Sequence, residues 1–76
     1  MTFKPKANMV AFFQQLLQCR GDVWFITTEG DQLNLKSTLS QFIFVAAHAG
    51  QMQPPVGVVH LDDPNDLPLL QNYLQP

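Results

Sequence analysis

Apolar residues between positions 8 and 20 recur at three- and four-residue spacing, with glutamines on the opposite side. This period is typical of an amphipathic α-helix. Asn8 can cap the first turn, and Gly21 can end the helix in a left-handed conformation. The pattern therefore predicts a helix over residues 8–20.

The next apolar segments have the composition of β-strands. Residues 22–28 are rich in aromatic and β-branched side chains, residues 32–35 alternate polar and apolar, and a Glu-Gly-Asp segment lies between them. Two such runs joined by a short glycine-containing loop are typical of a hairpin. We therefore expect antiparallel strands on either side of Gly30.

The rest of the chain predicts a helix, a strand and a further helix. Helical spacing begins at Ser37 and continues to about Ala47, where Gly50 and two prolines interrupt it. Residues 56–61 form a strand, and a last short helix carries leucines as far as Leu74. Either of two residues can cap this last helix: Asn65 or Asp66.

This order of elements predicts an α+β fold. A short first strand at residues 2–4 would make the order β-α-β-β-α-β-α, an antiparallel sheet with helices packed on one face. The chain has 76 residues, with 46% hydrophobic and 13% charged side chains, which indicates one folded domain over residues 1–76 and argues against a disordered tail.

The charge pattern excludes several classes of partner. A net charge of -2 and a pI of 5.3 give no basic footprint for nucleic acid or an anionic membrane. The first residues lack the apolar segment of a signal peptide, and the longest apolar stretch, residues 42–47, is far shorter than the ~20 residues that span a bilayer. With Cys19 as the single cysteine, we expect a cytoplasmic protein.

Two segments carry a resemblance to a known family. A strand and a Glu29-Gly30 turn are followed by Leu-Asn-Leu-Lys-Ser, ending at Ser37 and leading into a short helix; residues 61–67 then form an acidic turn before a leucine-spaced helix. Over residues 22–74 the chain resembles the HPr family of phosphocarriers of the phosphotransferase system. The resemblance implies an open-faced β-sandwich.

The phosphoacceptor motif of that family is missing. HPr proteins carry H-x-R-P at the start of the first helix, whereas this chain reads Thr2-Phe3-Lys4-Pro5, with threonine in place of the histidine. The resemblance therefore implies a non-catalytic HPr-like regulatory or protein-interaction domain, not an enzyme. The alternatives are a free-standing interaction or oligomerisation module and, least favoured, a phosphocarrier that uses His48 or His60.

Ser37 is the sharpest regulatory candidate. The resemblance places it at the serine that HPr kinase-type regulators phosphorylate. A phosphate there would meet the first-turn amides of a helix, with Lys36 alongside as a second contact candidate. The simpler alternative is that Ser37 only caps the helix.

Aromatic residues supply the remaining contact candidates. Trp24 and the next residue point to opposite sides of one strand, and we expect Trp24 on the open face of the sheet as a contact with a protein partner or a second copy. Residues 42–45 are contiguous large apolar side chains, so some must face outward. The resemblance makes Phe44 or Val45 a partner contact, the alternative being that the following loop and the last helix cover them.

No metal or cofactor is expected. His60 and the carboxylates that follow it match no established ligand spacing, and a solvated turn before a helix explains them. Cys19 lies at the end of the first helix, where the helix dipole disfavours a thiolate, so we expect it to be inert.

Overall fold

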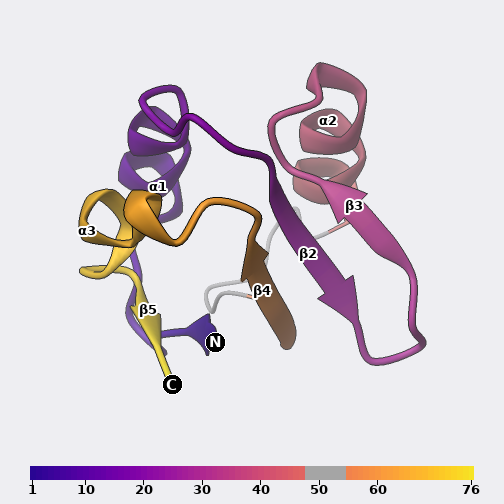
Figure 1. Ribbon diagram of the computed structural model, residues 1–76. Helices are drawn as coiled ribbons and strands as arrows, with labels where there is room; N and C mark the ends of the chain where they lie inside the picture. Colours follow the sequence, from indigo (N-terminus) through magenta and orange to yellow (C-terminus); the bar gives the residue numbers. More distant parts are fainter. Residues whose placement is uncertain (48–54) are drawn as a thin grey trace.

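A computed structural model describes residues 1–47 and 55–76 as a small α+β fold (Figure 1), which confirms the predicted class. The elements in chain order are β1 (Thr2–Phe3), α1 (Met9–Leu16), β2 (Val23–Thr27), β3 (Gln32–Asn34), α2 (Thr38–Ala47), β4 (Gly57–Leu61), the 3-10 helix η1 (Pro64–Asp66), α3 (Leu67–Leu70) and β5 (Leu74–Gln75). The predicted order is present, and β5 is an addition to it. None of these helices is long and apolar enough to cross a membrane.

The strands form two small antiparallel sheets. One sheet has the order β3-β2-β4, and Phe25 at its centre lies opposite Leu33 on one side and Val59 on the other. The second pairs β1 with β5. The sheets meet where the amide of Val59 donates a 2.7 Å hydrogen bond to the carbonyl oxygen of Met1. The first strand was uncertain from sequence, and the structure places it between β4 and β5.

Helix α1 begins where expected and ends early. The side chain of Asn8 accepts a 3.1 Å hydrogen bond from the amide of Ala11, which confirms the predicted cap. The C-cap is Leu17 in a right-handed conformation, so a left-handed Gly21 as the helix terminator was wrong. Gly21 is instead required by packing, because a Cβ atom there would lie 2.9 Å from the Cβ of Asp63.

The predicted hairpin is confirmed. Gly30 has a φ of 92°, a conformation that glycine adopts without steric cost. The amide of Gly30 donates to the carbonyl of Thr27 at 3.0 Å, and the amide of Thr27 donates to the carbonyl of Asp31 at 2.9 Å. These bonds close the turn between β2 and β3.

The C-terminal segment differs from its prediction. α3 ends at Leu70, and Leu74 lies in β5 opposite Phe3, with both side chains buried. Because Leu74 pairs with β1, the helix does not continue to Leu74 as the leucine spacing predicted. Of the two predicted caps, Asp66 occupies the N-cap position of α3, but its side chain makes no capping hydrogen bond. The side-chain cap lies one element earlier, where Asp63 caps η1 by accepting a 2.9 Å bond from the amide of Asn65.

All three α-helices contribute to one core on one face of the larger sheet. Its buried hydrophobic residues are Phe3, Phe12, Leu16, Cys19, Val23, Phe25, Leu35, Phe44, Val59, Leu70 and Leu74. Aromatic rings hold its centre, with Phe25 and Phe44 centroids 5.2 Å apart and Phe3 and Phe12 centroids 5.0 Å apart, both in edge-to-face geometry. On the opposite face Trp24 is only half-buried, as strand alternation requires.

Candidate functional site

Helix α2 presents two large apolar side chains to solvent. Leu39 is 68% exposed and Phe42 is 72% exposed, and residues three apart on a helix share one side. Together with Ser37 at the start of the helix, they are called the α2 surface below. This confirms the expectation that part of the apolar run beginning at Phe42 faces outward.

Phe44 is not among the residues of this apolar run that face solvent. Its side chain is 3% exposed, and its ring packs edge-to-face against Phe13 at 5.6 Å as well as against Phe25. A residue buried among core rings cannot contact a partner without unfolding, so Phe44 is corrected from contact candidate to core residue. The side chain of Val45 lies outside the described residues.

Ser37 lies at the start of α2. Its carbonyl oxygen accepts the first intrahelical bond, 2.9 Å from the amide of Gln41, and its own amide donates to the carbonyl of Asn34 at 3.0 Å. Ser37 therefore has the backbone position of a cap residue, and its side chain is half-buried. Its phosphorylation stays a prediction.

Lys36 joins two loops that are distant in sequence. Its Nζ donates a 2.5 Å hydrogen bond to the carbonyl oxygen of Cys19, and its amide donates to the side chain of Asn34 at 3.0 Å. The ammonium therefore satisfies a carbonyl just beyond the end of α1. This structural role was not foreseen from the sequence.

Asp66 is the one buried charged residue among the described residues. Its carboxylate accepts hydrogen bonds from the amides of Arg20, at 3.0 Å, and Gly21, at 2.9 Å. These backbone bonds lower the pKa of Asp66, and the Lys36 and Arg20 charges act in the same direction while burial opposes them. Asp66 therefore fastens the α1–β2 loop to the C-terminal segment and is not available as a solvated ligand.

Cys19 is a core residue next to this junction. Burial raises the pKa of its thiol, the Asp66 carboxylate raises it further, and Lys36 partly opposes both. A thiol held in its protonated form is a poor nucleophile. The environment of Cys19 therefore fits the inert side chain expected from sequence.

The open face of the larger sheet carries Trp24, where the sequence placed it. The indole Nε1 donates to Asp62 Oδ2 at 3.2 Å, and the other carboxylate oxygen lies 3.5 Å from His60 Nε2. Trp24 and His60 are cross-strand neighbours on β2 and β4. One carboxylate thus lies close to both ring nitrogens at one end of the sheet and accepts a hydrogen bond from the indole.

The histidines and carboxylates form no metal site in the part of the chain that the structure describes. Within residues 1–47 and 55–76, no three His, Cys, Asp or Glu side chains lie close enough together to hold a metal ion. His60 lies on a strand, without the helix N-terminus that would stabilise an incoming phosphoryl group. His48 lies outside the described residues.

Comparison with protein-family models, with curated proteins and with solved structures finds no match to this chain. The HPr-like assignment therefore remains a prediction from the residues that carry the resemblance.

Proposed function

We propose that this chain is a non-catalytic, HPr-like interaction domain of the cytoplasm that binds another protein through the α2 surface. The observation that carries the proposal is the exposure of Leu39 and Phe42 on one side of α2. In a 76-residue chain, large apolar side chains are needed for the core, and these two contribute little to it. Adjacent exposed apolar side chains are typical of a binding surface.

Burial of the α2 surface by a partner would contribute a moderate binding free energy. Burying a large apolar side chain fully is favourable by roughly 1.5–3 kcal/mol, so two residues that are already about one-third covered would contribute roughly 2–4 kcal/mol together. That is enough to anchor an interface, although affinity also requires polar contacts around the anchor. Removing the two side chains should therefore abolish binding without affecting the fold.

Ser37 is the proposed regulatory position on the same surface. A phosphate group would add about -1.5 to -2 charges within one turn of the apolar anchor. The charge would be tolerated by the fold because it lies at the start of α2, but it would have to be desolvated in an apolar interface. Phosphorylation of Ser37 is therefore expected to alter partner binding more than stability.

The experiment compares two double variants as baits for co-purification from cells of the source organism. L39S/F42S removes the two apolar side chains of the α2 surface, whereas V10S/L17S removes an equally exposed apolar pair, Val10 in α1 and its C-cap residue Leu17. The partner should be retained by the wild-type protein and by V10S/L17S and lost by L39S/F42S. Retention by both double variants, or loss from both, contradicts the proposal.

Three further measurements separate the alternatives. Self-association of the wild-type chain in sedimentation, abolished by L39S/F42S, would indicate the oligomerisation module instead. Intact mass after incubation with an HPr kinase and ATP should increase by one phosphate in the wild-type protein and not in S37A. Transfer of an acid-labile phosphate from phosphoenolpyruvate through the general phosphotransferase enzyme would indicate a histidine phosphocarrier and contradict a non-catalytic role.

A further inference from the structure

A strip of side chains crosses the face of the larger sheet that lies opposite the helices. Its cross-strand pairs are Trp24 with His60 and Ile26 with Val58. Side chains alternate along a strand, so the same face continues to Asp22 and Asp62 at one end and to Thr28 and Val56 at the other. The amide of Asp62 donates to the carbonyl of Asp22 at 3.0 Å, so the acidic pair extends the sheet. This set of eight residues is called the open strip below.

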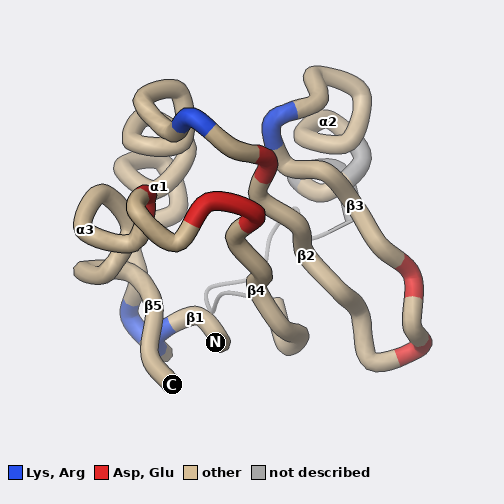
Figure 2. The backbone as a smooth tube through the Cα atoms, viewed as in Figure 1, with Lys and Arg blue, Asp and Glu red and all other residues tan. Residues whose placement is uncertain are grey.

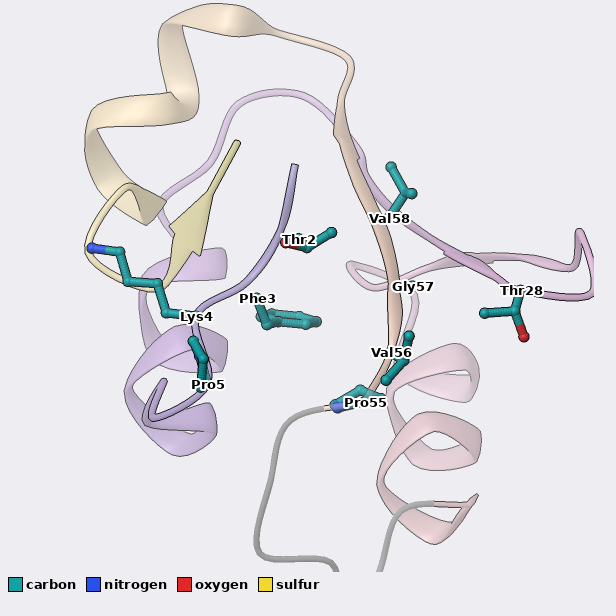
Figure 3. Close-up of a pocket in the computed structure, with 9 residues that line it drawn as sticks. All are labelled: Thr2, Phe3, Lys4, Pro5, Thr28, Pro55, Val56, Gly57 and Val58. Carbon is teal, nitrogen blue, oxygen red and sulfur yellow. The ribbon is translucent and has the colours of Figure 1, made fainter.

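The apolar end of the open strip leads into a cavity of about 430 Å³. Thr28, Val56 and Val58 belong to both. Figure 3 shows the Phe3 ring reaching from β1 toward β4, with Val56 and Pro55 on the other side of the cavity. Val56 is 81% exposed and Val58 is 45% exposed, so these side chains leave apolar surface uncovered at the cavity mouth. The cavity is large enough for one bulky side chain.

The opposite end of the open strip is acidic. Asp22 and Asp62 close it, Asp63 follows directly, and Figure 2 shows the red acidic segments of the backbone beside one another where β2 begins and β4 ends. The cavity lining has the opposite character, because it includes Lys4 and, among the described residues, no carboxylate. The open strip therefore runs from an anionic end to an apolar end.

We propose that the open strip binds an extended segment of a partner protein that has a Lys or Arg side chain at one end and a bulky apolar side chain at the other. The cation would pair with the carboxylates of Asp22 and Asp62 and lie against the indole of Trp24, whose plane is held by its bond to Asp62. The apolar side chain would fill the cavity beside Val56.

The length of the open strip sets the length of the segment. Successive cross-strand pairs on one face are two residues apart, or about 6.8 Å, so the distance from the acidic pair to the Val56 pair is roughly 20 Å. An extended peptide covers this in about six steps, that is seven residues, and the side chains of its first and seventh residues point to the same face. The same carboxylates repel phosphate groups, so a nucleic acid or an anionic membrane is not a suitable occupant. This site is separate from the α2 surface and does not depend on it.

Trp24 provides the assay, because it is the only tryptophan in the chain and lies inside the proposed site. Its fluorescence is followed during titration with an array of heptapeptides that carry Lys, Arg, Gln or Glu at one end and Phe, Leu or Ser at the other, in both orientations. Peptides with a cation at one end and Phe or Leu at the other should bind, and peptides with Glu or Ser at those ends should not. Raising the salt concentration should weaken binding.

Two variants with the same change of charge test where the cationic peptides bind. Asp62→Asn should weaken binding of the cationic peptides about two- to fivefold, the value of one exposed ion pair. Asp31→Asn, the same charge change at the exposed hairpin turn, should leave binding unchanged. The proposal is overturned if no peptide binds, if Arg and Glu peptides bind alike, if both variants act equally, or if Trp24 fluorescence reports a second copy of this chain on the strip.

Discussion

Gly57 is a position at which the packing of the core leaves no room for a side chain. A Cβ atom on Gly57 would lie 2.5 Å from Cζ of Phe25 and 2.6 Å from the carbonyl oxygen of Ile26. The Phe25 ring thus lies directly against the backbone of β4, in the centre of the aromatic core. Gly57→Ala adds one methyl group at the point where no space exists for it.

The expected cost follows from this overlap. A strand glycine replaced by alanine in open space stabilises a protein by about 0.4–1 kcal/mol through the unfolded state. Overpacking costs about 1–3 kcal/mol, and because one of the overlapped atoms belongs to the backbone we expect the upper end of this range, which leaves a net loss of about 2 kcal/mol. A domain of 76 residues has a stability of roughly 4–11 kcal/mol, so the midpoint of thermal unfolding should fall by about 8–16 °C.

Gly30→Ala is the matched control. Gly30 has a positive φ but no atom within 4 Å of the added methyl group, so alanine there meets only a backbone penalty of about 1–2 kcal/mol. Both variants are measured by urea unfolding and by thermal melting followed by circular dichroism. If Gly57→Ala is as stable as the wild-type protein, or loses less than Gly30→Ala, the packing argument is refuted. Phe25→Leu in the Gly57→Ala background should recover part of the loss, because leucine lacks the overlapping ring atoms.

Three further predictions test the core and the junction beneath it. The pKa of Asp66 is lowered on folding, so its carboxylate contributes to the free energy of unfolding above the unfolded pKa, near pH 4, and this contribution is lost as the pH falls through the folded pKa. The difference in free energy of unfolding between the wild-type protein and D66N, measured in urea, should therefore narrow as the pH is lowered from 7 to 2. A difference that stays constant over this range contradicts the prediction. Phe12→Ala should cost about 3–5 kcal/mol because its side chain is 0% exposed, whereas Val10→Ala on the same helix should change stability by about 0.5 kcal/mol or less; equal effects would place Phe12 outside the core. Cys19 should react with iodoacetamide slowly in the native protein and rapidly in urea, and fast native labelling would contradict its raised pKa and burial.

The surface residues show where prediction from sequence reached its limit. Strand alternation was enough to place Trp24 and Phe25 on opposite faces of the sheet, because neighbouring strand residues must point in opposite directions. The helix that carries Phe42 and Phe44 has no comparable signal, since consecutive apolar residues are compatible with several orientations. Contacts with Phe13 and Phe25 decide that Phe44 points inward and leave Phe42 at the surface.

Asp66 shows the same limit for a polar residue. Its position before a leucine-rich segment is typical of a helix cap, which is a local interaction. In the structure its carboxylate instead accepts the amide of Arg20, 46 residues earlier in the chain. Nothing in the local pattern indicates that the α1–β2 loop needs an acceptor there.

The sequence by itself determined the order of the elements from α1 to α3, because hydrophobic period, caps and turn residues act over a few positions along the chain. It also determined the fold class, since an amphipathic helix and a half-buried strand must each cover an apolar side. The tertiary structure alone decided that Leu74 pairs as a strand with Phe3, that Gly57 lies beneath the Phe25 ring and that Asp66 closes a loop. These contacts join segments far apart in the chain, so their energies depend on packing and leave no trace in local periodicity.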